Sequence, residues 1–285
     1  MKKIAVVTDT NSGISTDYAK ELGVYLIPMP FIVEGKEYFE NESCTYEEFF
    51  EMLAEGKNVT TSQPAPYALT SIWDKLLEEY DEIVYIPMSS ALSGSCATAK
   101  SLALDYNGKV CVVDNKRISI TQMQSVLDAL KLATEGFSAK EICEKLEETA
   151  FDCSIYLAVN TLELLKKSGR VTSAGAALAT ILGLKPVLQI QGEKLDAFAK
   201  VRGMANAEKT MLNAIKKDCE ERFAGRKITI RLAYSGDIEP ANEWLKTCRE
   251  FFGDDSIQMY KLPISICCHV GAGVKAIGVL TSIDE

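Results

Sequence analysis

Apolar runs alternate with helical patterns along the first half of this 285-residue chain. The runs at 3–9, 24–33, 83–88 and 109–113 predict extended strands, and the periodic or capped segments between them predict helices. Alternation of this kind favours a parallel sheet with helices on both faces, which is a three-layer α/β domain. Ligands of such sheets bind outside the carboxyl ends of the strands, where the polar turns of this sequence collect.

Two of these turns are rich in hydroxyl groups. Residues 60–64 read Thr-Thr-Ser-Gln-Pro, and residues 89–95 read Ser-Ser-Ala-Leu-Ser-Gly-Ser. A strand that turns through Ser and Gly into a helix points hydroxyls and free backbone N–H groups at one spot, which favours an anion. Neither turn contains Lys or Arg, so we expect a single carboxylate there rather than a polyphosphate. The competing interpretation is ordinary N-capping, by Thr61 or Ser62 at the first turn and by Ser93 at the second.

The second half of the chain has a different rhythm. A helix capped by Ser138 ends near Thr149, and the next strand begins at Ser154. We therefore expect an N-terminal parallel α/β domain over residues 1–152 and a C-terminal domain over residues 153–285. A hairpin and several further strands predict a mixed sheet in the second domain, with strands at 154–159, 186–190, 195–200, 227–234, 257–262 and 276–280.

Charge and cysteine usage exclude several function classes. The net charge of −9, spread along the chain, argues against nucleic acid or an anionic membrane surface as the main partner. No apolar stretch approaches the ~20 residues that a membrane span needs, so we expect no stable membrane insertion. The nine cysteines are scattered without a CxxC pair, and the chain begins directly with a strand. These two features predict a cytoplasmic protein.

His269 is the only histidine and lies in the sequence Cys-Cys-His-Val-Gly-Ala-Gly. Nearby glycines let a backbone approach a ligand closely, so His269 is a candidate to hold a carboxylate or to act as a base. The competing interpretation is a structural histidine. We expect no metal site, because three consecutive residues do not readily converge on one ion and no second Cys/His cluster has zinc spacing.

Known catalytic and nucleotide-binding motifs are missing from the sequence. Residues 271–276 match the pattern GxGxxA, but too few residues follow for the βαβ unit that gives this pattern its meaning. The sequence contains neither the P-loop pattern GxxxxGK[ST] nor the nucleophile-elbow pattern GxSxG. These absences disfavour a P-loop kinase and a nucleophile-elbow hydrolase.

In their order along the chain, eight short segments resemble the DegV family, the bacterial fatty-acid-binding proteins that serve as the acyl-carrying component of fatty acid kinase. The segments are Val7-Thr8-Asp9-Thr10, Thr61-Ser62-Gln63-Pro64, Leu92-Ser93-Gly94, Val112-Val113-Asp114, Gly169-Arg170-Val171, Lys185-Pro186, Lys200-Val201-Arg202-Gly203 and His269-Val270-Gly271. The resemblance implies an N-terminal three-layer domain with a parallel sheet and a C-terminal two-layer α/β domain with a mixed sheet. It also implies that the ligand lies between the two domains.

The resemblance implies a role for particular residues. Thr61 and Ser93 would bind the carboxylate of a long-chain fatty acid such as palmitate, with Ser62, Gly94 and His269 close by. The acyl chain would run into an apolar tunnel. A separate fatty acid kinase catalytic protein would phosphorylate the carboxylate with ATP, and Arg202 would lie on the surface that meets this partner. On this interpretation the chain is not itself an enzyme and needs no cofactor.

Simple energetics are compatible with this interpretation. Burial contributes ~0.8 kcal/mol per methylene, so a long acyl chain supplies on the order of 10 kcal/mol before ordering costs. Charge-assisted hydrogen bonds to the carboxylate add about 1.5–3 kcal/mol each and mainly set its position. A few neutral hydroxyls are therefore enough, and they leave a carboxylate oxygen available to attack ATP.

Two departures from the family pattern concern the ligand. Ala272 stands where the family usually has Pro, and Lys275 follows shortly after. Residues 119–122 read Ser-Ile-Thr-Gln in a stretch that is Gly- and Leu-rich in relatives. If that stretch lines the tunnel, it favours a shorter tail or one with polar groups.

Two alternative functions remain open at this stage. The first is an esterase or thioesterase with Ser93 as nucleophile and His269 as base, although no third residue is evident to orient the histidine. The second draws on the substrate subunit of dihydroxyacetone kinase, whose architecture the DegV family is thought to share. In that case His269 would bind a small carbonyl compound.

Overall fold

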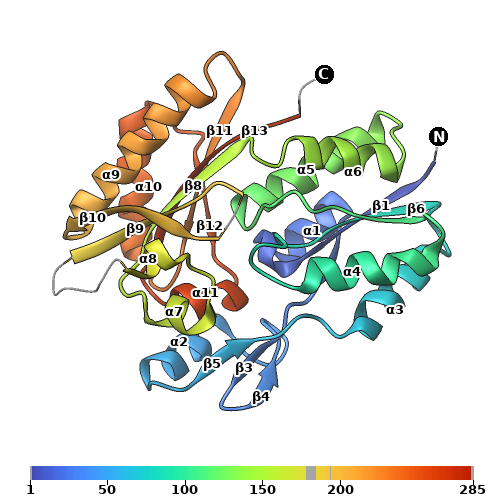
Figure 1. Ribbon diagram of the computed structural model, residues 1–285, viewed down its shortest axis with the longest axis horizontal. Helices are drawn as coiled ribbons and strands as arrows, with labels where there is room; N and C mark the ends of the chain where they lie inside the picture. The colour runs from blue at the N-terminus through green and yellow to red at the C-terminus, as the bar shows by residue number, and fades with distance from the viewer. Residues whose placement is uncertain (1, 178–183, 193, 284–285) are drawn as a thin grey trace. The chain divides into compact units, whose positions relative to one another are not determined.

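The computed structural model describes residues 2–177, 184–192 and 194–283 (Figure 1). The chain forms two compact units that interleave in sequence. Unit 1 comprises the residues up to Pro30, Ser62–Phe151 and the chain from Ser282 onward, and unit 2 comprises Phe31–Thr61 and Asp152–Thr281. A single division after residue 152 therefore does not describe the segment 31–61, which belongs with the C-terminal residues.

Unit 1 is built on a four-stranded parallel sheet with the order β2-β1-β6-β7. Its strands are β1 (Ile4–Asp9), β2 (Tyr25–Ile27), β6 (Glu82–Ile86) and β7 (Val110–Val112). Its helices are α1 (Thr16–Leu22), α3 (Pro66–Leu76), α4 (Ser95–Ala103), α5 (Ile120–Thr134) and α6 (Ala139–Glu148), with 3-10 turns at Thr10–Ser12 and Leu104–Tyr106. Figure 1 shows α3 and α4 on one side of this sheet and α5 and α6 on the other, which confirms the predicted three layers.

The apolar side chains of α3 and α4 explain why these helices cover one face of the sheet. Leu69, Trp73 and Leu76 follow each other at helical spacing on α3 and are buried. The Trp73 ring meets Tyr85 of β6 edge to face, with 5.8 Å between the ring centroids. The same apolar cluster includes Cys96 of α4, so this free thiol is part of the core.

The extended run at 24–33 does not form one strand. Tyr25–Ile27 is β2 of the parallel sheet, whereas Phe31–Val33 is β3 and belongs to a different sheet in unit 2. The sequence between them is Pro28-Met29-Pro30. Proline has no N–H to donate to a strand ladder, so the two prolines end the first pairing and let the chain leave the sheet.

Unit 2 contains a mixed six-stranded sheet and a small antiparallel sheet. The large sheet has the order β10-β9-β8-β13-β11-β12, and the small one has the order β4-β3-β5. The remaining strands are β4 (Lys36–Tyr38), β5 (Val59–Thr61), β8 (Cys153–Ala158), β9 (Leu184–Ile190), β10 (Asp196–Arg202), β11 (Ile228–Tyr234), β12 (Gln258–Lys261) and β13 (Lys275–Thr281). The helices are α2 (Tyr46–Ala54), α7 (Glu163–Ser168), α8 (Ser173–Ala177), α9 (Met204–Lys217), which continues as a π-helical turn at Asp218–Arg222, α10 (Ile238–Phe252) and α11 (Ile264–Val270). The predicted mixed sheet and its β9–β10 hairpin pairing are confirmed.

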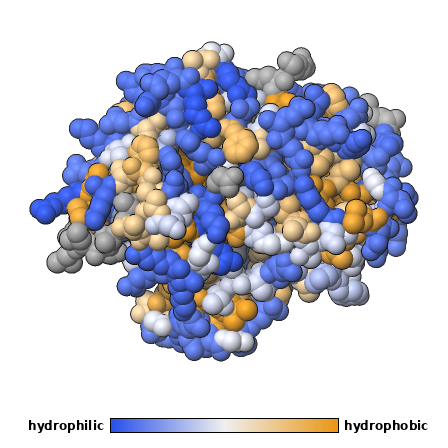
Figure 2. Space-filling model, in the orientation of Figure 1, coloured by the Kyte–Doolittle hydropathy of each residue, from blue (hydrophilic) through white to orange (hydrophobic). Residues whose placement is uncertain are grey.

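Helices α9 and α10 pack on the large sheet through a continuous apolar cluster. Met211 and Ile215 of α9 and Trp244 of α10 are fully buried there beside Leu232 of β11. On the face drawn in Figure 2, hydrophilic side chains are interspersed with apolar ones, as the distribution of charges in the sequence predicts. None of the described helices combines the length and the apolar character that a membrane crossing requires.

Candidate functional site

Thr61 is placed by the small sheet of unit 2. It is the last residue of β5, and the antiparallel pairing of β5 with β3 sets Thr61 opposite Phe31. Phe31 is fully buried and contacts Phe49 of α2 edge to face, so the strand beside Thr61 is anchored in the core. The Thr61 hydroxyl lies 2.9 Å from Nε2 of His269. Two residues that the sequence analysis assigned to one site therefore meet within unit 2.

His269 is placed by the short helix α11, which contacts β5, β3 and α7. The helix follows Pro263, and its first free N–H, on Ile264, donates to the Glu40 carboxylate at 2.8 Å. The buried Cys267 thiol donates to the Leu262 carbonyl. Cys267 and Cys268 therefore pack the helix into the unit. Among the described residues, no group of three metal-ligating side chains is found.

The imidazole of His269 is neutral at physiological pH. Burial, with a smaller contribution from the Arg170 guanidinium, lowers the pKa of His269 from 6.5 to about 4. Nε2 bonds Thr61, while Nδ1 has no hydrogen-bond partner in the described part of the chain. The hydrogen bond between Thr61 and His269 thus joins two uncharged groups.

The loop after His269 is held by two residues from other parts of unit 2. The Ser235 hydroxyl donates to the Gly271 carbonyl at 2.7 Å and accepts from the Val274 N–H at 3.0 Å. The Asn160 amide donates to the Ala272 carbonyl at 3.0 Å. These bonds fix the end of α11 and with it the direction of the His269 side chain.

The GxGxxA match at 271–276 has a structural explanation. Gly273 has a φ of +74°, and a Cβ at this position would overlap the Asn160 amide nitrogen. The loop leads from helix α11 into strand β13, which is the reverse of the strand-to-helix order of a dinucleotide fingerprint. The rejection of this pattern as a nucleotide site is consistent with the fold.

The second hydroxyl turn belongs to unit 1 and joins β6 to α4. Ser93 and Gly94 lie in it, and Ser62 lies in the segment that leads to α3 of the same unit. The Ser93 hydroxyl donates to the Ser95 hydroxyl at 3.0 Å and accepts from the Ser95 N–H at 3.2 Å. Ser95 is buried and shares the hydroxyl pair, although the sequence analysis did not select it as a site residue.

N-capping accounts for the Ser93 hydroxyl of the second turn but not for the hydroxyls of the first turn. The residue before α3 is Ala65, and the residue before α4 is Gly94. Neither Ala65 nor Gly94 makes a side-chain capping bond. Pro66 is well suited to start α3, because it lacks the N–H that has no partner within the helix at this position. Gly94 is already helical in φ and ψ, so Ser93, whose hydroxyl accepts from the Ser95 N–H at 3.2 Å, caps α4. The hydroxyl of Thr61 caps no described helix and bonds His269 instead.

Two cations near these residues were not expected from the sequence. The Lys116 ammonium donates to the Ser90 hydroxyl in the second turn, and Arg170 lies close enough to His269 to lower its pKa. Both come from segments remote from the turns, so counting Lys and Arg inside the turns missed them. Their positions in the sequence point to them, since Arg170 belongs to the segment 169–171 and Lys116 closely follows the segment 112–114.

Residues that depart from the family pattern form polar contacts inside each unit. The Gln122 side chain is fully buried, and its amide nitrogen lies 3.1 Å from Thr8 Oγ1, Asp9 Oδ1 and the Ile86 carbonyl. Thr121 bonds the carbonyl of Ile118. In unit 2, Lys275 forms an ion pair with Glu208. These polar groups are thereby engaged in hydrogen bonds and an ion pair within their own units, and those of Gln122 join the ends of β1 and β6.

Arg202 is the last residue of β10, the edge strand of the large sheet, and its side chain is exposed. Lys200, two residues earlier on the same strand, is also exposed. An edge strand with exposed cations is a common protection against unwanted strand pairing, and it also offers a charged surface to a partner.

The protonation of His269 can be followed directly, because it is the only histidine in the chain. We expect its NMR signal to titrate with a pKa of about 4 in the folded protein. As the pH falls from 6.5 to about 4, the unfolded chain binds a proton that the folded chain does not, so the free energy of unfolding should decrease over this window. A His269→Gln variant should lack this part of the slope. A folded-state midpoint near 6.5 would contradict the buried neutral imidazole.

Comparison with known proteins places the whole chain in one family. The family model described as "Uncharacterised protein, DegV family" matches residues 3–282. A DegV domain-containing protein of Caldanaerobacter subterraneus is 30% identical over 246 residues, which are 85% of this chain and 88% of that protein. A solved DegV family structure from Thermus thermophilus, described as fatty acid binding, is 31% identical, with a TM-score of 0.89 and coverage of 98% of this chain and 99% of that chain.

A second solved structure shares the fold at lower identity. The fatty acid binding DegV family protein of Streptococcus agalactiae is 24% identical, with a TM-score of 0.88 and full coverage of both chains. The match of the family model to nearly all of the chain, together with the identity to the Caldanaerobacter protein, shows that this chain belongs to the DegV family.

Proposed function

We propose that this protein binds a long-chain fatty acid, such as palmitate, and presents its carboxylate to a separate ATP-dependent fatty acid kinase. The observation that carries the proposal is the 2.9 Å contact between Thr61 Oγ1 and His269 Nε2. Family membership supports the class of ligand, since the Thermus and Streptococcus DegV proteins are described as fatty acid binding.

The neutral state of His269 suits a residue that orients Thr61. A neutral imidazole carries one N–H. With this proton on Nε2, His269 donates to Thr61 Oγ1 and leaves the Thr61 O–H free to donate to a carboxylate. The role proposed for His269 is therefore to direct the hydroxyl of Thr61 toward the ligand.

The same features disfavour His269 as the base of an esterase. A histidine with a pKa of about 4 is a weak base at neutral pH. In the described residues its Nδ1 bonds no carboxylate, so the group that orients the histidine of a Ser-His-Asp triad is missing. No feature of the structure specifically favours the binding of a small carbonyl compound either.

Ser93 completes the proposed carboxylate site, with Ser62 and Gly94 beside it. Ser93 is partly exposed, and its O–H, which donates to the Ser95 hydroxyl here, can rotate to a ligand oxygen instead. The acyl chain would be buried in an apolar tunnel and supply most of the affinity. Neutral donors position the carboxylate and leave an oxygen free to attack ATP on the kinase.

The thiols support a reducing compartment, and we infer a cytoplasmic protein. All nine cysteines are free. Burial raises the pKa of several of them, with that of Cys96 and that of Cys143 at about 12, so these thiols are unreactive at neutral pH. Unpaired structural thiols of this kind are usual where glutathione and thioredoxin keep cysteines reduced.

The proposal is tested by extracting the natively purified protein and identifying bound acids by mass spectrometry. We expect a long-chain fatty acid in the extract and a rise in melting temperature of the delipidated protein with C14–C18 acids, because a ligand of the folded state stabilises it by mass action. The proposal fails when no acid is bound and no acid shifts the melting temperature. Labelling of Ser93 by a fluorophosphonate probe would favour the esterase instead.

The carboxylate site is tested by removing one hydroxyl at a time. Thr61→Val and Ser93→Ala should each weaken palmitate binding by about 10- to 100-fold, because each removes a charge-assisted bond of about 1.5–3 kcal/mol. Thr60→Val is the matched control, since Thr60 is the exposed neighbour on the same strand. Calorimetric affinities of the three variants decide the assignment, and an equal loss in Thr60→Val would overturn it.

The surface for the kinase is tested at the edge strand. Arg202→Ala should leave palmitate binding intact and lower the rate at which a purified fatty acid kinase catalytic protein phosphorylates the bound acid with ATP. We expect the rate at limiting protein to fall by about tenfold, as is typical when an Arg anchor is removed from an interface. Lys140→Ala, which removes an exposed cation of α6 in unit 1, is the control and should leave the rate unchanged. Equal loss of acid binding in Arg202→Ala and Ser93→Ala would refute this division of roles.

A further inference from the structure

The turn that carries Ser93 is held by more than the helix that follows it. At the start of α4 the Ser93 hydroxyl accepts from the Ser95 N–H and donates to the Ser95 hydroxyl. The backbone of Ser93 is also placed by bonds made earlier in the turn. Those bonds run to a second segment of unit 1, residues 114–117.

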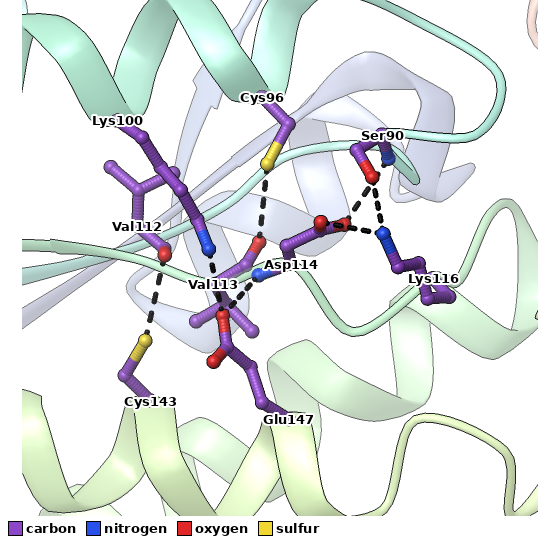
Figure 3. A network of polar contacts seen from close by, with 9 residues as sticks. All are labelled: Ser90, Cys96, Lys100, Val112, Val113, Asp114, Lys116, Cys143 and Glu147. Carbon is purple, nitrogen blue, oxygen red and sulfur yellow. Dashed lines mark hydrogen bonds and ion pairs between the residues drawn. The ribbon is translucent and has the colours of Figure 1, made fainter.

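Segment 114–117 bonds the turn at two successive residues. The Ser89 N–H donates to the carbonyl of Arg117 at 2.9 Å, and the Ser90 N–H donates to Asp114 Oδ1 at 3.2 Å. The Lys116 ammonium donates both to the Ser90 hydroxyl and to Asp114 Oδ2, the latter at 2.7 Å. Figure 3 shows the three side chains of Ser90, Asp114 and Lys116 pointing toward one another.

The bonds within the turn carry this placement on to Ser93. The Ser89 carbonyl accepts from the N–H of Leu92 at 3.0 Å and from the N–H of Ser93 at 3.1 Å. The Ser89 hydroxyl accepts from the Ala91 N–H at 3.2 Å. A shift of residues 89 and 90 therefore moves the backbone of Ser93 directly.

Asp114 is itself held from behind. Its N–H donates to the Glu147 carboxylate of α6 at 2.8 Å, and Glu147 forms an ion pair with Lys100 of α4 at 3.1 Å (Figure 3). The Cys96 thiol of α4 donates to the carbonyl of Val113, the residue before Asp114. The end of β7 is thus tied to helices on both sides of the sheet.

Two further observations concern the ion pair of Asp114 and Lys116. Burial alone would raise the pKa of Asp114, but hydrogen bonds from Lys116 and Ser90 outweigh it and hold the pKa below 3.8. Lys116 also has a φ of +58°, a conformation that non-glycine residues rarely adopt. Such a backbone persists only where the surroundings enforce it.

We propose that Asp114 and Lys116 are positioning residues that hold the 89–95 turn so that the Ser93 hydroxyl meets the ligand carboxylate. This inference rests on the proposed function. Lys116 contributes its ammonium to the turn and Asp114 neutralises it, so the pair sets geometry without adding net charge. The ligand contact itself remains with Ser93.

The test uses Lys116→Gly, which removes the ammonium and suits the positive φ, so that backbone strain is relieved rather than added. Asp114→Ala removes the other half of the pair. Lys131→Met is the control, since Lys131 forms an ion pair with Glu135 elsewhere in unit 1. Affinities are measured for palmitate and for 1-hexadecanol, a ligand of matched chain length without a carboxylate.

We expect Lys116→Gly and Asp114→Ala to weaken palmitate binding by about tenfold and hexadecanol binding by less than about threefold, because a misplaced hydroxyl loses a charge-assisted bond but the chain stays buried. Lys116→Arg should restore most of the palmitate affinity, and Lys131→Met should bind both ligands as the wild type does. A parallel loss of both ligands, or no loss of palmitate affinity, would overturn the positioning role.

Hydrogen exchange of the ligand-free protein tests the geometry without any ligand. The amides of residues 91–93 should exchange faster in Lys116→Gly than in the wild type, and unchanged exchange would overturn the inference. A wild-type protein that binds no palmitate overturns the proposed function and the positioning role together. Binding by the wild type with no selective loss in the variants overturns the positioning role alone.

Discussion

One hydrogen bond, between Thr61 Oγ1 and His269 Nε2, joins residues 208 positions apart in the sequence. Thr61 reaches it because β5 pairs with β3 after the chain has left the parallel sheet. His269 reaches it because Glu40 binds the start of α11 and Ser235 binds the loop after its end. The small sheet places Thr61 and the contacts of α11 place His269, so the hydrogen bond between them depends on both.

A buried polar network plays the corresponding part in unit 1. Gln122 of α5 bonds the ends of β1 and β6 through Thr8, Asp9 and the Ile86 carbonyl. Asp9 also accepts from the Met88 N–H at 2.8 Å, and burial raises the pKa of Asp9 to about 6 against the opposing effect of these hydrogen bonds. Breaking such a network leaves buried groups unsatisfied, which costs more than the bonds contribute. The strand end from which the Ser93 turn departs is therefore rigid.

The parts of the structure that depend on local pattern could be predicted from the sequence. Periodicity and capping predicted the alternating strands and helices, and the hydroxyl turns drew attention to Thr61 and Ser93. Pairing between distant segments could not be predicted in this way. The sequence does not say that residues 31–61 join the C-terminal half, because strand pairing depends on partners remote in the chain. Lys116 was missed for the same reason, since only folding brings it to Ser90.

Folding brings cations near the hydroxyl residues, but these cations leave the expectation of neutral carboxylate donors unchanged. The Lys116 charge is balanced by Asp114, and the Lys275 charge is balanced by Glu208. Burial keeps the imidazole of His269 neutral, and the Arg170 charge adds a smaller effect in the same direction. The proposed ligand carboxylate would then meet neutral hydroxyl donors rather than a bidentate cation. Such donors position the carboxylate while leaving it nucleophilic, which is what presentation to a kinase requires.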